Sequence, residues 1–263
     1  MPRYDADDLS MFYRTTGEGD PVLLIHGLGS DNTGWEFQED ALAERFHLIM
    51  PDLRGHGTTT VKELGMMIPP GAIADDLNGL LNHLGIEKVH VVGISLGGLV
   101  AQTFVLRHPD KVDKLVLVDT TPKVTEDLID VVYSWREAQV EGGDEAYFWT
   151  SLRSGYSDEW IENNPDMVQY LKEKSKNTND EGVLAAGLGF STIDYTEDLS
   201  RIKSRTLIIH GDDDRIMDLK MGRLLHEGIT GSKLKIFKGC GHSPTVQMTE
   251  EFNEVLIDFL DEK

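Results

Sequence analysis

Ser95 stands at the centre of the segment 93–97, which reads Gly-Ile-Ser-Leu-Gly. A serine hydroxyl attacks a carbonyl carbon when a base removes its proton and N–H donors stabilise the oxyanion that forms. Glycines two positions before and after the serine permit a tight, strained turn that exposes Oγ. A short apolar run, 89–92, precedes this turn and a longer one, 96–106, follows it, so a strand-to-helix connection is expected. This context favours Ser95 as a nucleophile.

The segment 26–29, His-Gly-Leu-Gly, follows another short apolar run. Acyl transfer needs two N–H donors aimed at the developing oxyanion. We expect the glycines to bend the backbone so that the N–H of Leu28 faces Ser95. The N–H of Leu96, at the start of the expected helix, is the second predicted donor. The ring of His26 is expected to hydrogen-bond the backbone of its own loop.

A nucleophilic serine needs an imidazole base, and the chain has nine histidines. His242 lies in Gly-Cys-Gly-His-Ser, where a loop follows the last short apolar run. His210 falls inside or at the end of a strand and His108 near a helix end, where packing or capping is the expected role. His56 also follows a strand, but its short glycine-bounded turn favours a structural role. His242 is therefore the predicted base.

The base needs a carboxylate that fixes its tautomer and stabilises its charged form. Three aspartates, 212–214, follow the short apolar run 206–209, which is the fifth such run along the chain. Because adjacent side chains point in different directions, at most one of them is expected to meet His242. Asp119 follows the preceding run at the same edge and is the alternative acid. The residues alone leave this choice open.

Short β-branched runs alternate with longer amphipathic ones along the chain. This alternation predicts an α/β fold, in which a parallel sheet has helices on both faces and carries its chemistry at the carboxyl ends of the strands. Helices are expected over 73–84, over 96–106 and after Thr249, which is expected to be an N-cap. The six predicted strands contain 22–25, 47–50, 89–92, 115–118, 206–209 and 234–237.

The alternation stops once, in the segment 122–198, where helical patterns follow one another without a strand between them. Thr125 is expected to cap one of these helices and Pro165 to open another. We therefore expect a core domain formed by residues 1–121 and 199–263. Residues 122–198 are expected to be inserted as a helical cap over the active edge of the sheet.

These motifs occur together and in order, and the chain resembles the α/β-hydrolase superfamily over nearly its whole length. The resemblance implies the α/β-hydrolase fold, with a mostly parallel central sheet, helices on both faces and a helical cap insertion. It also selects the last aspartate of Gly-x-x-Asp, so that Asp214 is the predicted acid. The matching pieces are His26-Gly27, the run Pro-Asp-Leu-Arg-Gly-His-Gly at 51–57, the turn around Ser95, Gly211-x-x-Asp214 and Gly241-His242.

Within that superfamily the chain is most similar to small carboxylesterases and to 3-oxoadipate enol-lactonases. Haloalkane dehalogenases and epoxide hydrolases use an aspartate in place of Ser95, which disfavours both. Carbon–carbon bond hydrolases usually have Asn before the nucleophile and a Gly-Pro-Gly oxyanion loop, where this chain has Ile94 and Leu28-Gly29-Ser30. The resemblance implies a serine hydrolase that cleaves carboxylic esters or lactones through an acyl-enzyme. The alternatives are a carbon–carbon bond hydrolase, a cofactor-free perhydrolase and a non-enzymatic ligand receptor with a retained triad.

Half of the aromatic residues of the chain fall within 120–200. Some of them must dock the helices on the core. The excess predicts an apolar pocket for the acyl or aromatic part of a small-molecule ester or lactone. The candidate pocket residues are Trp135, Tyr147, Phe148 and Trp149.

The composition of the chain indicates which binding partners and which cellular compartment to expect. Acidic residues outnumber basic ones by 46 to 25, and a net charge of −21 repels nucleic acid and anionic membranes. A single cysteine, Cys240, argues against an intrachain disulfide and a cysteine-based metal site. The expected chemistry needs neither a metal nor an organic cofactor. We expect a cytoplasmic protein, because the sequence has no apolar signal core and no membrane-spanning run, and homodimer formation is left open.

Overall fold

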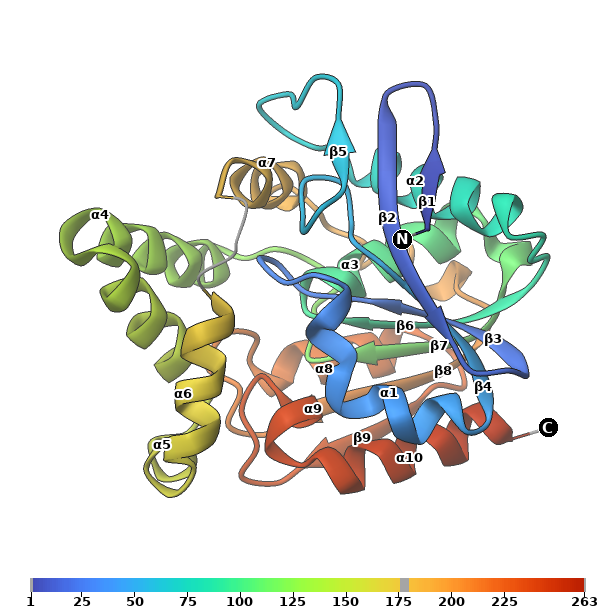
Figure 1. The fold of residues 1–263 in the computed structure, drawn as a ribbon. Coiled ribbons are helices and arrows are strands. Elements are labelled where there is room, and N and C mark those ends of the chain that lie inside the picture. Colours follow the sequence, from blue (N-terminus) through green and yellow to red (C-terminus); the bar gives the residue numbers. More distant parts are fainter. Residues whose placement is uncertain (1, 176–179, 263) are drawn as a thin grey trace.

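A nine-stranded sheet runs through the centre of the computed structural model, which describes residues 2–175 and 180–262 (Figure 1). The strand order is β1-β2-β4-β3-β6-β7-β8-β9, and β5 pairs with β2. The six strands from β4 to β9 in this order are parallel, whereas β1, β2 and β5 form antiparallel pairs. The bounds are β1 Arg3–Asp5, β2 Leu9–Thr16, β3 Asp20–Ile25, β4 Phe46–Pro51, β5 Thr60–Val61, β6 Val89–Ile94, β7 Val112–Val118, β8 Arg205–Gly211 and β9 Lys233–Phe237.

The six parallel strands contain the six predicted runs, and the predicted fold class is confirmed. Runs of four or five consecutive residues in β3, β6 and β7 are buried, because helices cover both faces of the sheet. The sequence pattern does not reveal β1, β2 or β5. β1 and β5 are short and mix polar and apolar residues, and the apolar run of β2, 11–13, is only three residues long and lies between polar residues.

Helices pack against both faces of the sheet. One apolar cluster joins the sheet to α2 (Pro70–His83), α3 (Leu96–Arg107) and α8 (Leu219–Gly228), and a second joins it to α1 (Glu36–Ala43) and α10 (Thr249–Asp261). α3 is buried nearly all round because it crosses the central strands, which holds its first residue at the carboxyl edge of the sheet. The short helices are η1 Asn32–Trp35, η2 Pro109–Lys111, η4 Leu199–Arg201 and α9 Pro244–Gln247.

The expectation that Thr249 is an N-cap is wrong. α9 leads almost directly into α10, Met248 is at the N-cap position and Thr249 is the first helical residue. The Thr249 hydroxyl donates to the carbonyl oxygen of Thr245 at 2.9 Å. The preceding short helix supplies that acceptor, so the side chain turns back toward it instead of accepting an N–H of α10.

Between β7 and β8, the described residues form helices and one isolated β-bridge, between Lys123 and Asp194. As predicted, the Thr125 hydroxyl accepts the N–H of Leu128 at 3.3 Å, and Pro165 is the first residue of a helix. We call the segment 122–198 the helical insertion, and Figure 1 shows its helices beside the ends of the parallel strands. Its helices are α4 Glu126–Gly155, α5 Asp158–Asn163, α6 Pro165–Lys174 and α7 Asp180–Phe190.

Long apolar helices of the kind that cross a bilayer are absent from the part of the chain that the structure describes.

Candidate active site

Ser95 occupies the connection between β6 and α3 with a backbone conformation that only strained turns show. Its φ is +56° and its ψ is −121°, a region that residues other than glycine rarely adopt. Two hydrogen bonds hold the turn: the N–H of Ser95 donates to the carbonyl of Val118 at 2.9 Å, and the Thr120 hydroxyl donates to the carbonyl of Ser95 at 2.8 Å. The half-buried side chain of Ser95 therefore has a fixed place at the strand end.

The glycines around Ser95 are required by the close approach of three backbones. A Cβ on Gly93 would lie 2.2 Å from the carbonyl oxygen of Gly97, and a Cβ on Gly97 would lie 2.2 Å from that of Ile25. Any side chain at either position would displace the turn or the neighbouring strand β3.

The loop after β3 runs alongside the serine. A Cβ on Gly27 would lie 3.4 Å from the Cβ and 3.9 Å from the Oγ of Ser95. Leu28 follows Gly27 in the chain. Leu96 is the first residue of α3, where backbone N–H groups have no acceptor within the helix. The assignment of these two N–H groups to an oxyanion hole stays a prediction.

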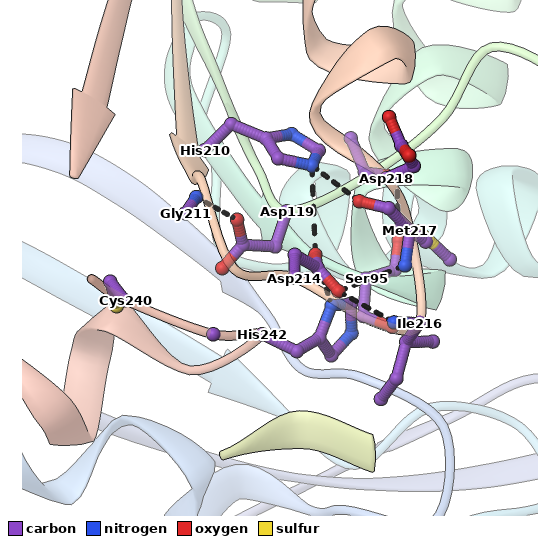
Figure 2. Close-up of polar contacts among 12 residues, drawn as sticks. Ser95, Asp119, His210, Gly211, Asp214, Ile216, Met217, Asp218, Cys240 and His242 are labelled. Carbon is purple, nitrogen blue, oxygen red and sulfur yellow. Dashed lines mark hydrogen bonds and ion pairs between the residues drawn. The ribbon is translucent and has the colours of Figure 1, made fainter. Parts of the chain in front are cut away.

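His242 and Asp214 form a direct hydrogen bond, with 2.7 Å between His242 Nδ1 and Asp214 Oδ2 (Figure 2). The second carboxylate oxygen, Oδ1, accepts the backbone N–H groups of Ile216 and Met217, each at 2.9 Å. Because Nδ1 donates to an acceptor-only carboxylate, Nε2 of the neutral ring is left as the atom that can accept a proton. Both side chains are buried, which keeps this bond away from water.

The loop that carries His242 is held from two sides. The backbone N–H of His242 donates to the carbonyl of Gly155, at the end of α4, at 2.8 Å. A Cβ on Gly211 would lie 2.3 Å from the carbonyl oxygens of Cys240 and Gly241, so the loops after β8 and β9 touch. The contact with Gly155 is missed by sequence reasoning, since nothing in the sequence pairs two backbone groups so far apart in the chain.

The electrostatics of the pair favour opposite charges. Burial lowers the pKa of His242, but the charge and the hydrogen bond of Asp214 outweigh burial and raise that pKa above its usual value. Burial raises the pKa of Asp214, and the charge and hydrogen bond of His242 more than offset it, so that this pKa is lowered. Asp214 is thus suited to stay ionised while the imidazole gains and loses a proton.

The other candidate acids have different partners. Asp212 Oδ1 accepts the N–H of Gly239 at 2.6 Å, and Asp213 forms an exposed ion pair with Arg215. Of the three adjacent aspartates, Asp214 is the one whose carboxylate bonds to the imidazole.

Comparison with known proteins connects this geometry to a family. A sequence profile of the α/β hydrolase fold matches residues 20–247. The chain belongs to the α/β-hydrolase family. Among relatives by sequence, 2-hydroxy-6-oxononadienedioate/2-hydroxy-6-oxononatrienedioate hydrolase 1 of Pseudomonas putida is 30% identical over 275 residues, covering 97% of this chain and 94% of that protein.

Two solved structures are similar over almost the whole molecule. An esterase from Thermogutta terrifontis is 28% identical with a TM-score of 0.88, covering 99% of this chain and 98% of that one. The enol-lactonase from Burkholderia xenovorans LB400 is 24% identical with a TM-score of 0.89, covering 99% of this chain and all of that one, a likeness that shows the fold alone. The expected resemblance to esterases and enol-lactonases is confirmed, for the enol-lactonase in the fold, and the relatives by sequence also include a hydrolase named for 2-hydroxy-6-oxononadienedioate.

Two other histidines of this α/β-hydrolase support the loops around the site. His26 hydrogen-bonds the carbonyl of Gly27 through Nδ1 at 2.8 Å and accepts the N–H of Leu53 at Nε2 at 3.1 Å. The His56 ring lies 5.1 Å from the His26 ring, and burial followed by the nearby His26 lowers the pKa of His56 to about 3. Both rings therefore stay neutral near neutral pH, as expected for structural histidines.

The aromatic candidates of the helical insertion make most of their recorded contacts within the insertion. Trp135 Nε1 donates to the Ser154 hydroxyl at 3.0 Å, and Phe148 packs with Leu152 and Val168. The other two candidates, Tyr147 and Trp149, are half-buried on α4. The Trp149 ring lies 5.6 Å from the Arg153 guanidinium and 5.8 Å from the Lys172 ammonium. Their role as pocket residues stays a prediction.

A cavity of about 210 Å³ lies where the helical insertion begins. The first turn of α4, the loop 214–218 and the start of α8 line it, and Ser95 and His242 are not among its lining residues. It therefore borders the acid of the site and not the nucleophile.

Asp119, His210 and Asp214 have ligand-type atoms within 4.8 Å of one another, and they are the one such buried group in the described residues. Both oxygens of Asp214 accept N–H donors, and His210 Nε2 bonds to the carbonyl of Met217 at 2.6 Å. Because these atoms are already hydrogen-bonded, too few ligand atoms are free to complete a tetrahedral or octahedral metal site. We interpret the group as support for the His242–Asp214 pair.

Proposed function

We propose that this α/β-hydrolase is a serine hydrolase that cleaves carboxylic esters or lactones, with Ser95, His242 and Asp214 as its catalytic residues. The observation that carries the proposal is the 2.7 Å bond between His242 and Asp214 at the same sheet edge as the strained serine turn (Figure 2). That bond orients the imidazole and supports its positive form, which is what a serine nucleophile requires.

The proposed reaction has two halves. In the first, Ser95 Oγ attacks the carbonyl carbon while His242 Nε2 takes the hydroxyl proton, and the N–H groups of Leu28 and Leu96 stabilise the oxyanion. His242 then gives its proton to the leaving alcohol, and an acyl-enzyme remains on Ser95. In the second half, His242 activates water, which releases the acid and restores the serine.

We further propose that residues 122–198 are a cap on a core formed by 1–121 and 199–263. The contact between Gly155 and the backbone of His242 supports this, because it brings the end of α4 to the edge where substrate must enter. The aromatic residues of the insertion support an apolar or aromatic acyl group as the part of the substrate held beneath the cap.

A carbon–carbon bond hydrolase is the second candidate, because a relative of that activity is 30% identical to this chain. The two activities share the fold, so they are separated by the bond that is cleaved. A non-enzymatic receptor would bind such ligands without turnover.

A substrate panel tests the proposal. Purified protein is assayed with p-nitrophenyl acetate, butyrate, octanoate and benzoate, with five- and six-membered lactones, and with a 2-hydroxy-6-oxo-dienoate ring-cleavage product. We expect turnover of esters or lactones that requires Ser95. Faster cleavage of the dienoate than of any ester would support the second candidate, and thermal stabilisation by a ligand without turnover would support a receptor.

A further inference from the structure

Asp119 is a buried carboxyl group for which the proposed reaction has no use. It follows β7 directly, with a left-handed φ of +40°. Its N–H donates to the carbonyl of Ile209 at 2.9 Å, and its Oδ1 accepts the N–H of Gly211 at 2.8 Å. Among the described residues, Oδ2 has no hydrogen-bond partner, although it is fully buried. A buried polar atom without a partner is costly, so this side chain calls for an explanation.

The neighbours of Asp119 are the polar groups of the proposed site. β7 and β8 are paired in parallel, so Asp119 and the loop bearing Asp214 leave neighbouring strand ends. Figure 2 shows both carboxyl groups on the same side of the His242 ring. The titratable groups that face Asp119 are Asp214 from the loop after β8, His210 from β8, and His242 and Cys240 from the loop after β9.

These surroundings favour one negative charge and not two. Burial, followed by the charge of Asp214, raises the pKa of Asp119 well above its usual value, and the charge of His242 opposes this. Burial also lowers the pKa of His210, so that His210 supplies no positive charge near neutral pH. Among these groups, only the imidazole of His242 becomes a cation. If Asp119 and Asp214 were both ionised, they would repel each other in a buried space.

We infer that Asp119 is a reserve counter-charge for His242: it keeps a proton while Asp214 is ionised, and it ionises to support the imidazolium when Asp214 carries no charge. It acts through its charge and is a positioning residue, whereas Asp214 makes the hydrogen bond. The proton balance is simple, since Asp119 releases one proton to solvent and no covalent bond changes. The inference rests on the proposed function, in which His242 is the base.

The first test needs only Asp214→Asn and the pH dependence of kcat/KM, whose acid limb reports the pKa of the base in the free enzyme. If Asp119 ionises in its place, the anion next to His242 is retained, and the limb should stay within roughly half a pH unit of the wild-type limb. If Asp119 stays neutral, burial without a counter-charge should move the limb down by about one unit or more. That second outcome would overturn the inference.

A double-mutant cycle gives the second test. Asp119→Asn should lower kcat/KM at least about tenfold more in the Asp214→Asn background than in the wild type, because only there is its charge needed. The Asp119→Asn/Asp214→Asn protein should also show the lowered acid limb. Equal losses in the two backgrounds would contradict the inference.

A folding control and a function control accompany these tests. Thermal melting identifies any variant that unfolds, and should the double variant do so, the acid limb of Asp214→Asn decides alone. A failure of the proposed function would appear as wild-type hydrolysis that does not require Ser95. A failure of this inference leaves wild-type hydrolysis intact and changes only the pH limb and the cycle.

Discussion

The carboxyl edge of the sheet and helices α4 to α6 of the helical insertion differ in how firmly their residues are held. At the sheet edge, Ser95 is held through its N–H and its carbonyl, and Asp214 through both carboxylate oxygens. In this part of the insertion, α4 is interrupted at Gly143, and Tyr133 and Val140 are 60% and 74% exposed. Its own apolar cluster is small, built on Phe148, Leu152 and Val168.

The insertion meets the core in two ways. α7 packs tightly on the core: Ala185, Ala186 and Phe190 belong to the apolar cluster that joins the sheet to α2, α3 and α8, and the N–H of Ile68 donates to the carbonyl of Ala185 at 2.9 Å.

Helices α4 and α6 contact the core through polar groups. The carbonyl of Gly155 accepts the N–H of His242, the Tyr170 hydroxyl donates to Glu36 at 2.6 Å, and Lys174 pairs with the same carboxylate. The difference between the sheet edge and helices α4 to α6 indicates that the two regions have different roles. Reaction chemistry depends on atoms held in one geometry, whereas a pocket wall can change its shape or its side chains without loss of the reaction.

The largest effect is expected from Ser95→Ala, which tests whether the reaction depends on the sheet edge. We expect the rate of ester hydrolysis to fall by about 10⁵-fold or more, since the covalent route is lost while oxyanion stabilisation remains. A fluorophosphonate probe should label the wild type and fail to label the variant. Ser30→Ala, on the neighbouring loop, is the matched control and should keep its labelling. Persistent labelling of Ser95→Ala would place the nucleophile elsewhere.

Asp214→Asn should have the next largest effect. We expect kcat to fall by about 10³-fold with little change in KM, because an amide can fix the wrong tautomer of His242 and Asp119 replaces only the charge of Asp214 and not its hydrogen bond. Asp213→Asn is the control, since its ion pair with Arg215 is exposed, and it should stay within a few-fold of the wild type. Equal losses in both variants would mean that the loop as a whole, and not the bond to His242, matters.

A pair of glycine substitutions compares the packing at the serine turn with the packing at an open position of α7. Gly97→Ala should reduce the free energy of unfolding by about 3 kcal/mol or more, because the added Cβ would lie 2.2 Å from the carbonyl oxygen of Ile25. Gly187→Ala, in α7, meets no atom within 4 Å and should raise it by about 0.5–1 kcal/mol. Urea unfolding measures both. A destabilised Gly187→Ala would contradict the open space at this position, which differs from Gly182 and Gly189 of the same helix, where a Cβ would meet the backbones of Gly55 and Ile68.

The smallest effects are expected from the aromatic residues of the insertion. Trp135→Ala and Trp149→Ala should each change the ratio of kcat/KM for octanoate and acetate esters by about three- to tenfold, if these rings face the acyl chain. Tyr133→Ala is the control on the same helix, because Tyr133 is 60% exposed. An unchanged ratio in both tryptophan variants would mean that these rings only pack the insertion, and that the acyl chain binds elsewhere.

The fold follows from local patterns to a large extent. Six short apolar-rich runs predict the six parallel strands, and the first five are expected to be buried on both faces, because such strands admit few polar residues. β3, β4, β6, β7 and β8 are buried over most of their length, whereas β9 is only half-buried. The antiparallel strands β1, β2 and β5 could not be predicted in this way, since β1 and β5 are short and partly exposed and the apolar run of β2 is only three residues long. The start of the last helix was also missed, because the helix preceding Thr249 supplies an acceptor that no local capping rule includes.

For the site, the sequence by itself determined which residue types can react and their order along the chain. Serine between glycines, the histidine after the last strand and the group of aspartates are all visible as motifs. Tertiary structure decided which aspartate meets His242, because loops from β8 and β9 must touch before any carboxylate can reach the ring. It also brought Asp119 to the same place. Charges interact through space, so the protonation of two carboxyl groups 95 positions apart in the chain depends on a distance that only the folded sheet sets.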